Sequence, residues 1–375
     1  VLVDLTIALG PSGAARHQLG KDERLAASRL PEYLQSAAPE IRGLALKLCV
    51  LLQDVPSFQS AFRMGQGSVA MNFPGLHLEV HVLGDGSVVT WGHADFGGDS
   101  RDAQHQLRDV QHIQASHFAF AAIRSDGSVV TWGSVNRGGD SSVVQDQLRD
   151  VQQIQASLFA FAAILGDGSV VTWGDAGKGG DSSAVQEQLR DVQQIQASQQ
   201  AFAAILADGS VVTWGHADYG GDSSSVQNQL RDVQHIQASY SAFAAILGDG
   251  SVVTWGKADF GGDSSAVREQ LRDVQQIQAC IHAFAAIRSD GSVVTWGRTD
   301  YGGDSSAVQD QLRDVQQIQA SNCAFAAILG DGSVVSWGDA AYGSDSSGVQ
   351  HQLRDAQHIQ ASVGAFAAIL GDGSV

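Results

Sequence analysis

Tryptophan recurs at a fixed interval through most of this sequence. All seven tryptophans are spaced 41 residues apart, with no insertion or deletion between copies: Trp91, Trp132, Trp173, Trp214, Trp255, Trp296 and Trp337. A period of this length constrains the fold, because each repeat is one supersecondary unit that buries its apolar face only against its neighbours. The sequence therefore predicts a tandem-repeat protein.

One repeat divides into four short segments with strand character. Residues 151–191 read VQQIQASLFAFAAILGDGSVVTWGDAGKGGDSSAVQEQLRD, and we expect strands at VQQIQAS, AFAAIL and SVVTWG and a fourth around VQEQLRD. The Gly166-Asp167-Gly168-Ser169 step predicts a type I′ hairpin turn, which needs positive φ at its central residues. The double glycine after Trp-Gly predicts a wider loop in which the Asp side chain forms an Asx turn.

Four strands of about five or six residues with short loops account for one period. This predicts an all-β fold, a β-propeller of four-stranded antiparallel blades. Helical repeats are disfavoured because the segments are rich in β-formers and broken by glycine. A β-solenoid is the remaining rival, but its coils are usually shorter, and paired Asp-Gly hairpins suit an antiparallel meander better.

The run IQAS-xx-AFAAI-xxDGSVVTWG-xxxxGG resembles the repeat of the regulator of chromosome condensation family, whose units place a small-residue pair, an Ala-Leu strand, a DG turn and a Trp-Gly strand end in this order. The resemblance covers about 300 of the 375 residues and recurs in every copy. It implies a seven-bladed propeller. The sequence departs from the family where a histidine often begins the second strand, because alanine stands there: Ala119, Ala160, Ala201, Ala242, Ala283, Ala324 and Ala365.

Three functions follow from the repeat and its resemblance. We favour a non-catalytic protein-protein interaction propeller that forms part of a larger multidomain scaffold or regulatory protein. The alternatives that the resemblance implies are a guanine nucleotide exchange factor for a small GTPase and the substrate-binding part of a HECT-type ubiquitin ligase. In the founding member, exchange depends on a wedge-like hairpin inserted in the propeller, and no insertion occurs between Trp91 and Trp337.

The ends of the chain differ from the regular repeats. Residues 1–65 are predicted to form a separate N-terminal segment with two helices, at 22–37 and 39–54, where leucines recur at helical spacing. Residues 66–375 are predicted to hold seven 41-residue repeats plus a partial eighth. Two ring closures are open: residues 70–356 form the ring and leave a tail, or the strands at 357–370 replace the degenerate first ones.

Charge is distributed unevenly along the chain. The net charge is −18, and residues 1–65 hold 7 basic and 6 acidic side chains, so the acidity belongs to the repeats. Such a surface argues against direct nucleic-acid binding, which needs basic side chains facing phosphates. It is compatible with basic protein partners, although a well-solvated surface is the simpler interpretation.

Three scattered cysteines, Cys49, Cys280 and Cys323, lack the spacing of a zinc site. They favour a reducing, intracellular and most simply cytoplasmic setting. No stretch approaches the roughly 18 apolar residues of a membrane span. We expect a monomer that does not bind membranes.

The sequence contains no catalytic constellation, and we expect no enzyme activity within this chain, no metal site and no cofactor. It has no GxSxG, HExxH, P-loop or dinucleotide motif. His77 and His81 lie on one face of a predicted strand without a third ligand nearby. The regularly placed tryptophans and the aspartates of the DGS and GGDSS steps are interpreted as packing and turn residues.

Positions that vary between the copies fall in two places, the pair after Ala-Ser or Ala-Cys and the stretch after Trp-Gly. In an up-and-down blade these two connections emerge at the same end of the strands. Aromatic and Arg side chains dominate interface hot spots. We therefore predict a partner-binding surface there, against the simpler alternative of neutral drift in exposed loops, comprising Phe96, Phe118, Arg137, Lys178, Tyr219, Tyr240, Phe260, His282, Tyr301 and Tyr342.

Overall fold

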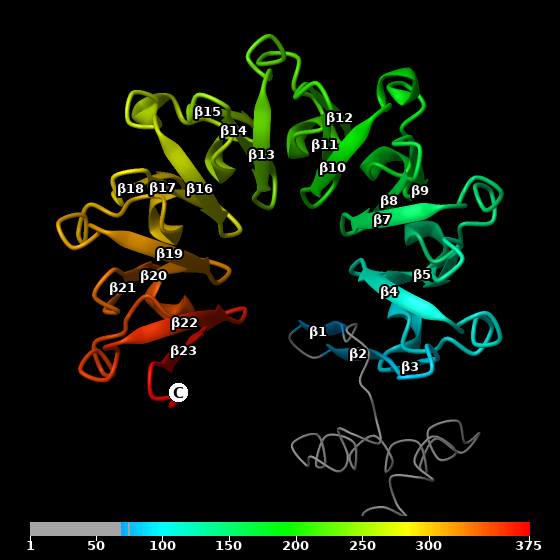
Figure 1. The fold of residues 1–375 in the computed structure, drawn as a ribbon, viewed down its shortest axis with the longest axis horizontal. Coiled ribbons are helices and arrows are strands. Elements are labelled where there is room, and N and C mark those ends of the chain that lie inside the picture. The colour runs from blue at the N-terminus through cyan, green and yellow to red at the C-terminus, as the bar shows by residue number, and fades with distance from the viewer. Residues whose placement is uncertain (1–68, 74–75) are drawn as a thin grey trace, which may run out of the picture. The chain divides into compact units, whose positions relative to one another are not determined.

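The computed structural model describes residues 69–73 and 76–375, and its architecture is a succession of small antiparallel β-sheets, one in each 41-residue repeat (Figure 1). The repeated all-β fold predicted from the sequence is confirmed. The predicted helices at 22–37 and 39–54 lie outside the described residues. The described residues form two compact units, the first ending at Ile113 and including Ala122–Asp126, the second comprising Gln114–Ala121 and Gly127–Val375.

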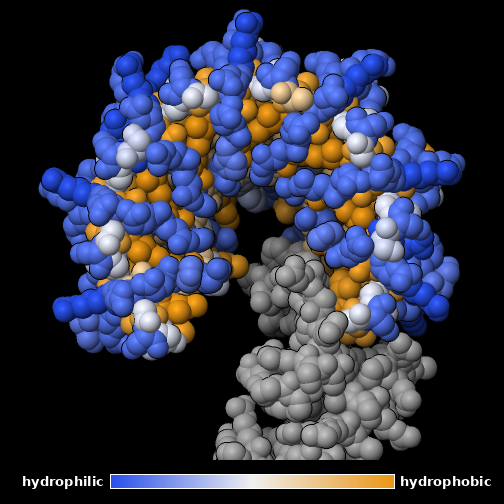
Figure 2. Space-filling model, viewed as in Figure 1, coloured by the Kyte–Doolittle hydropathy of each residue, from blue (hydrophilic) through white to orange (hydrophobic). Residues whose placement is uncertain are grey.

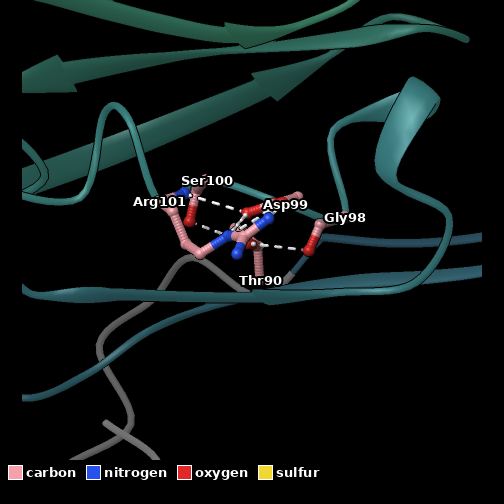
Figure 3. Close-up of polar contacts among 5 residues, drawn as sticks. All are labelled: Thr90, Gly98, Asp99, Ser100 and Arg101. Atoms are coloured by element: carbon pink, nitrogen blue, oxygen red, sulfur yellow. Dashed lines mark hydrogen bonds and ion pairs between the residues drawn. The ribbon is translucent and has the colours of Figure 1, made fainter. Parts of the chain in front are cut away.

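The first unit contains the sheet β1-β2-β3, formed by Val69–Phe73, Leu76–Val82 and Val88–Trp91. A short 3-10 helix, η2 (Ala94–Phe96), follows β3. Beyond it, Thr90 Oγ1 donates to the Gly98 carbonyl at 3.3 Å and to Ser100 Oγ at 2.8 Å (Figure 3). Arg101 Nε donates to Asp99 Oδ1 at 2.9 Å in the same loop (Figure 3). The Thr90 contacts hold the loop against the outer strand of the sheet.

Each following repeat supplies one sheet whose strands are ordered as in the sequence. The three-stranded sheets are β4-β5-β6 (Val110–Ala115, Ala119–Arg124, Val129–Gly133), β7-β8-β9 (Val151–Ala156, Ala160–Leu165, Val170–Gly174), β10-β11-β12 (Val192–Ala197, Ala201–Leu206, Val211–Gly215), β13-β14-β15 (Val233–Ala238, Ala242–Leu247, Val252–Gly256), β16-β17-β18 (Val274–Ala279, Ala283–Arg288, Val293–Gly297) and β19-β20-β21 (Val315–Ala320, Ala324–Leu329, Val334–Gly338). The last sheet has two strands, β22 (Ala356–Ala361) and β23 (Phe366–Leu370).

The middle strand of each sheet from β7-β8-β9 to β19-β20-β21 is covered on both faces. In β11, Ala201 to Ala204 are fully buried, because successive side chains point to opposite faces and each face packs on another sheet. Phe202 and Ala204 join Trp214 in packing against Ala160 and Ala162 of the preceding sheet. Ala201 and Ala203 pack against Phe243 of the following one. Small side chains on one face and an aromatic pair on the other therefore explain the Ala-Phe-Ala-Ala pattern.

The hairpin between the second and third strands is not the predicted type I′ turn. A type I′ turn requires positive φ at both of its central residues. In the turn after β8, Gly168 has φ of +78°, but neither Gly166 nor Asp167 has positive φ. Leu165 accepts from Gly168 N at 2.9 Å and donates to the Ser169 carbonyl at 2.9 Å. This is a three-residue loop ending in a left-handed glycine. Asp167 Oδ1 accepts from Ser169 N and Oγ, which lowers the pKa of Asp167.

The predicted fourth strand is also wrong: complete sheets in the described chain have three strands. Residues around VQEQLRD form tight turns, for example η5 (Gln186–Gln188), and η8 (Ser265–Val267) lies in the same part of a later repeat. The Gln186 side chain reaches back to the outer strand, where Nε2 donates to the Val170 carbonyl at 2.9 Å and Oε1 accepts from Ser182 Oγ. The Gln186 side-chain amide thus hydrogen-bonds to a backbone carbonyl at the edge of the sheet. A fourth strand would have paired with that carbonyl.

The other end of the strands is built from the constant residues. The Leu-Arg-Asp step ends in an aspartate with left-handed φ in every described repeat, such as Asp191 at +53°. Gly168 of the preceding hairpin packs directly on it, because a Cβ at Gly168 would lie 2.9 Å from Asp191 Cα. Val192 N donates to the Gly168 carbonyl at 2.9 Å. Successive repeats in the second unit are therefore joined through constant backbone contacts at this end.

Candidate partner-binding face

The two variable connections of each repeat meet at one end of the strands, as the sequence predicted. In the β7-β8-β9 repeat, Asp175 N donates to the Phe159 carbonyl at 3.0 Å, and Ser157 Oγ donates to the Lys178 carbonyl at 3.4 Å. The same hydroxyl contact recurs from Ser198 to Tyr219 at 2.7 Å. The contacts between DGS and Leu-Arg-Asp segments lie at the opposite end. The varying side chains therefore share one face of the second unit, which we call the variable face.

A short 3-10 helix after each Trp-Gly step positions the variable side chains. Asp175 caps η4 (Ala176–Lys178) by accepting from Gly177 N at 3.2 Å, and Gly179 ends it with φ of +98°. The corresponding turns in the second unit are η3 (Val135–Arg137), η6 (Ala217–Tyr219), η7 (Ala258–Phe260), η9 (Thr299–Tyr301) and η10 (Ala340–Tyr342). The last residue of each 3-10 turn varies between repeats. The geometry of the turn brings this residue next to the first variable connection of the same repeat.

A phenylalanine pair with two cations forms one part of the variable face. Phe118 and Phe159 stack with their ring centroids 5.4 Å apart. The Arg137 guanidinium lies 3.9 Å from the centroid of Phe118, and Lys178 Nζ lies 3.9 Å from the centroid of Phe159. Cations over ring faces are attracted by the ring quadrupole. Three of the four residues belong to the predicted binding set, and Phe159 lies at a varying position after Ala-Ser that the set left out.

A continuous aromatic row of five side chains forms the second part. Successive centroids are 6.5 Å apart for Tyr219 and Tyr240, 6.1 Å for Tyr240 and Phe260, 4.5 Å for Phe260 and His282, and 4.7 Å for His282 and Tyr301. The row crosses three consecutive repeats, and all five residues were predicted from the sequence. Tyr240 is the most open of them at 38% exposure.

Backbone hydrogen bonds between neighbouring repeats fix the first connections. Leu158 N donates to the Gln199 carbonyl at 3.0 Å, Gln199 N to Tyr240 at 3.0 Å, Tyr240 N to Ile281 at 3.2 Å and Ile281 N to Asn322 at 2.9 Å. These bonds do not depend on side chains, so the varying residues change without disturbing the frame. The aromatic row is therefore held in place before any partner binds, which reduces the ordering cost of binding.

Cations and a neutral histidine set the charge of the row. Lys257 Nζ lies 4.8 Å from the Phe260 centroid, and the Arg298 guanidinium lies 4.8 Å from the Tyr301 centroid. Burial, followed by the positive charges of Arg298 and Lys257, lowers the pKa of His282, so this ring is neutral at pH 7. Sequence reasoning omitted Lys257 and Arg298 from the predicted set, although both occupy varying positions after Trp-Gly.

Two further predicted residues, Phe96 and Tyr342, also follow a Trp-Gly step. Phe96 belongs to the first unit, where its ring meets His93 edge-on at 5.1 Å. Tyr342 ends η10, and its carbonyl accepts from Ser321 Oγ at 2.8 Å, but no ring contact joins it to the aromatic row in the described structure. Within the second unit, the described ring contacts of the row end at Tyr301, before Tyr342.

Neither of the two described cysteines has the surroundings of a nucleophile. Cys280 is 5% exposed, replaces the serine found in other repeats and contacts the Tyr301 carbonyl through Sγ at 3.2 Å. Burial raises the pKa of this thiol to about 11. Burial also raises the pKa of Cys323. No group of three metal-ligating side chains occurs among the described residues, and none of their helices is long and apolar enough to span a membrane.

We expect Cys280 to resist alkylation in the folded protein. A variant carrying Cys49→Ser and Cys323→Ser leaves it as the single thiol. At pH 8 iodoacetamide should react with it many-fold more slowly than with the urea-unfolded chain, because only the thiolate attacks. The folded-state rate should continue to rise with pH up to about 11, whereas the rate of the unfolded chain should level off above the ordinary thiol pKa of about 8.5. Equal rates in the folded and unfolded states at pH 8 would contradict this expectation.

Solved structures with a similar fold were found, whereas no family model and no curated protein matches the chain. Prp20p of Saccharomyces cerevisiae, the yeast RCC1, is 15% identical, with 72% of this chain and 78% of that chain covered and a TM-score of 0.41. The CRINKLY WD40 ectodomain of the Arabidopsis thaliana receptor kinase ACR4 is 16% identical, with 72% and 96% covered and a TM-score of 0.42. Human WBSCR16 is 16% identical, with 60% and 75% covered and a TM-score of 0.39.

Proposed function

We propose that this chain is a non-catalytic protein-binding module, a propeller of the repeat type described above, and that its variable face is the docking surface. The frame of each repeat is nearly constant, whereas the side chains on this face differ from copy to copy. A surface of this construction selects a partner through its varying residues and keeps its shape through the constant ones. The partner is a protein that presents apolar and hydrogen-bonding groups to a row of aromatic rings.

The observation that carries this proposal is the aromatic row with its flanking cations. The Tyr, Phe and His rings of the row combine large contact area with few rotatable bonds. Tyr and Arg are also among the residues enriched in interface hot spots. Scattered drift in exposed loops would not favour four consecutive ring contacts across three repeats. The polar tips of Tyr219 and Tyr240 supply hydrogen-bonding groups beside the apolar ring faces.

Substitution of Tyr219 and Tyr240 by alanine should abolish retention of the partner. The wild-type chain and the double variant are immobilised, lysate is passed over each, and retained proteins are quantified by mass spectrometry. The retained amount of any protein that binds through the row should be at least tenfold lower on the variant. The reason is that hot-spot side chains each contribute about 2 kcal/mol or more to binding.

A matched control is available at the opposite end of the strands. Arg190 and Arg231 are exposed in the constant Leu-Arg-Asp segments, and replacing both by alanine should leave the retained set unchanged. Circular dichroism and urea unfolding check that both variants keep the fold. An unchanged retained set on a folded tyrosine variant would refute the proposed docking surface.

A further inference from the structure

A glutamine side chain closes the outer strand edge in most repeats. In the β7-β8-β9 repeat, Gln186 Nε2 donates to the Val170 carbonyl at 2.9 Å, and Gln186 Oε1 accepts from Ser182 Oγ at 2.9 Å. The same two bonds are made in their own repeats by Gln104, Gln145, Gln227, Gln309 and Gln350. A backbone carbonyl and a serine hydroxyl thus form a two-point site for a primary carboxamide.

The β13-β14-β15 repeat keeps these two groups but not the glutamine. Arg268 stands at the glutamine position, and its Nη2 donates to Gln229 Oε1, in the segment before β13, at 3.3 Å. Ser264 Oγ accepts from Thr254 Oγ1 at 3.0 Å, so its own hydrogen remains available for donation. Within the described chain, no side chain donates to the Val252 carbonyl and no group accepts from the Ser264 hydroxyl. We call this carbonyl and this hydroxyl the carboxamide site.

The carboxamide site is reached from solvent. Val252 pairs with β14 in the same register as Val170 pairs with β8, so both carbonyls point to the outer edge of their sheets. Val252 and Ser264 are 9% and 8% exposed, whereas Val170 and Ser182 are 1% and 4% exposed. Gln186 is itself an exposed residue, so the place of its amide lies at the surface of the repeat. Replacement of the glutamine has therefore opened the site rather than closed it.

We propose that the carboxamide site binds, in trans, the side chain of a glutamine from another polypeptide. Its carboxamide oxygen accepts from Ser264 Oγ, and one of its N–H groups donates to the Val252 carbonyl, as the glutamines of the other repeats do in cis. A carboxylate has no hydrogen to donate to the carbonyl, and an ammonium or guanidinium group cannot accept from the hydroxyl, so the site selects a neutral amide. This binding does not depend on the variable face.

The surroundings of the site suit a polar ligand. Arg268, Glu269 and Gln270 are exposed beside it, and Figure 2 shows hydrophilic residues over most of the outer edge of the second unit. A glutamine that enters from water exchanges its hydrogen bonds to water for two bonds of fixed geometry. Two such bonds give weak binding on their own, so the site adds selectivity to a larger contact.

The test uses N-acetyl-glutamine N-methylamide, in which the side chain carries the one primary carboxamide. Saturation-transfer NMR with the full chain should show a saturable signal on the side-chain methylenes of this probe. Two analogues serve as controls: N-acetyl-glutamate N-methylamide at neutral pH, and the glutamine probe with a dimethylated side-chain nitrogen. Each should bind more than about fivefold more weakly, because each lacks the N–H that pairs with the Val252 carbonyl.

The protein side of the test uses Arg268→Gln, which supplies the carboxamide in cis. This variant should lose the probe signal and should unfold at a higher urea concentration than the wild-type chain. Arg268→Ala removes the arginine without supplying an amide and should keep the signal. Gln309→Ala opens the equivalent site in the β16-β17-β18 repeat and should add a second site of similar affinity.

Three results would overturn the proposal. The first is the absence of a saturable signal with the wild-type chain. The second is equal binding of the glutamine probe and either analogue, which would show that the bond to the Val252 carbonyl is not made. The third is an undiminished signal with Arg268→Gln, which would place the probe elsewhere on the protein. Urea unfolding checks that each variant is folded before its signal is compared.

Discussion

Replacing Phe284 by alanine should lower the free energy of unfolding by about 3–5 kcal/mol, the range for deleting a large aromatic side chain from a packed core. Phe284 is fully buried and stacks on Trp296 with the ring centroids 5.2 Å apart. It packs against Ala242 and Ala244 of the preceding sheet. Alanines on that face cannot extend into the vacated volume, so the cavity persists and its cost adds to the lost burial.

Urea denaturation followed by tryptophan fluorescence measures this effect. Phe260→Ala is the matched control, because Phe260 is the same residue type in the same part of the chain but is partly exposed on the variable face. Phe260 packs against the same core cluster but stays partly exposed, so its loss should lower the free energy of unfolding by about 1–2 kcal/mol, less than the loss of Phe284. Similar losses for the two variants would show that the Phe-Trp stack is not the main contact between successive sheets.

The repeat frame could be predicted from the sequence because it depends on local and periodic signals. Val-Val-Thr-Trp alternation, the Ala-Phe-Ala-Ala strand and the Asp-Gly step recur at constant spacing, and three of the four predicted strands form in each complete repeat. The fourth failed because VQEQLRD combines a buried leucine, Leu189, with polar residues that form turns. The contact that replaces a fourth strand, from Gln186 to the Val170 carbonyl, spans 16 residues and has no local signature.

The candidate site was predicted in position but not in detail. Strand alternation alone places both variable connections at one end of the strands, which the structure confirms. Which side chains touch depends on the distance between neighbouring repeats. The sequence therefore did not show that the rings of Phe260, His282 and Tyr301 would contact one another while that of Tyr342 would not join them. The left-handed aspartates were also unforeseen, because aspartate adopts positive φ only where tertiary contacts favour it.

Gly179→Ala should lower the free energy of unfolding by about 2–4 kcal/mol, for two reasons that add. Gly179 has φ of +98°, where any Cβ is strained. A Cβ there would also lie 2.5 Å from Cδ2 of Phe202, a fully buried ring. Relief would require Phe202 to move away from Trp214, whose Nε1 donates to the Gly179 carbonyl at 3.1 Å. The substitution therefore disturbs a turn, an aromatic stack and a buried hydrogen bond together.

Gly177→Ala, two residues earlier in the same turn, provides the control. Gly177 is exposed, has no positive φ, and a Cβ there would come no closer than 3.7 Å to another atom. Alanine at this position should change the free energy of unfolding by less than about 0.5 kcal/mol or raise it slightly, because it restricts the unfolded chain. Urea midpoints of the two variants distinguish the explanations. Equal midpoints would mean that the Phe202 ring yields to the new methyl group, and a large loss at Gly177 would mean that the turn itself, rather than the stack beneath it, limits stability.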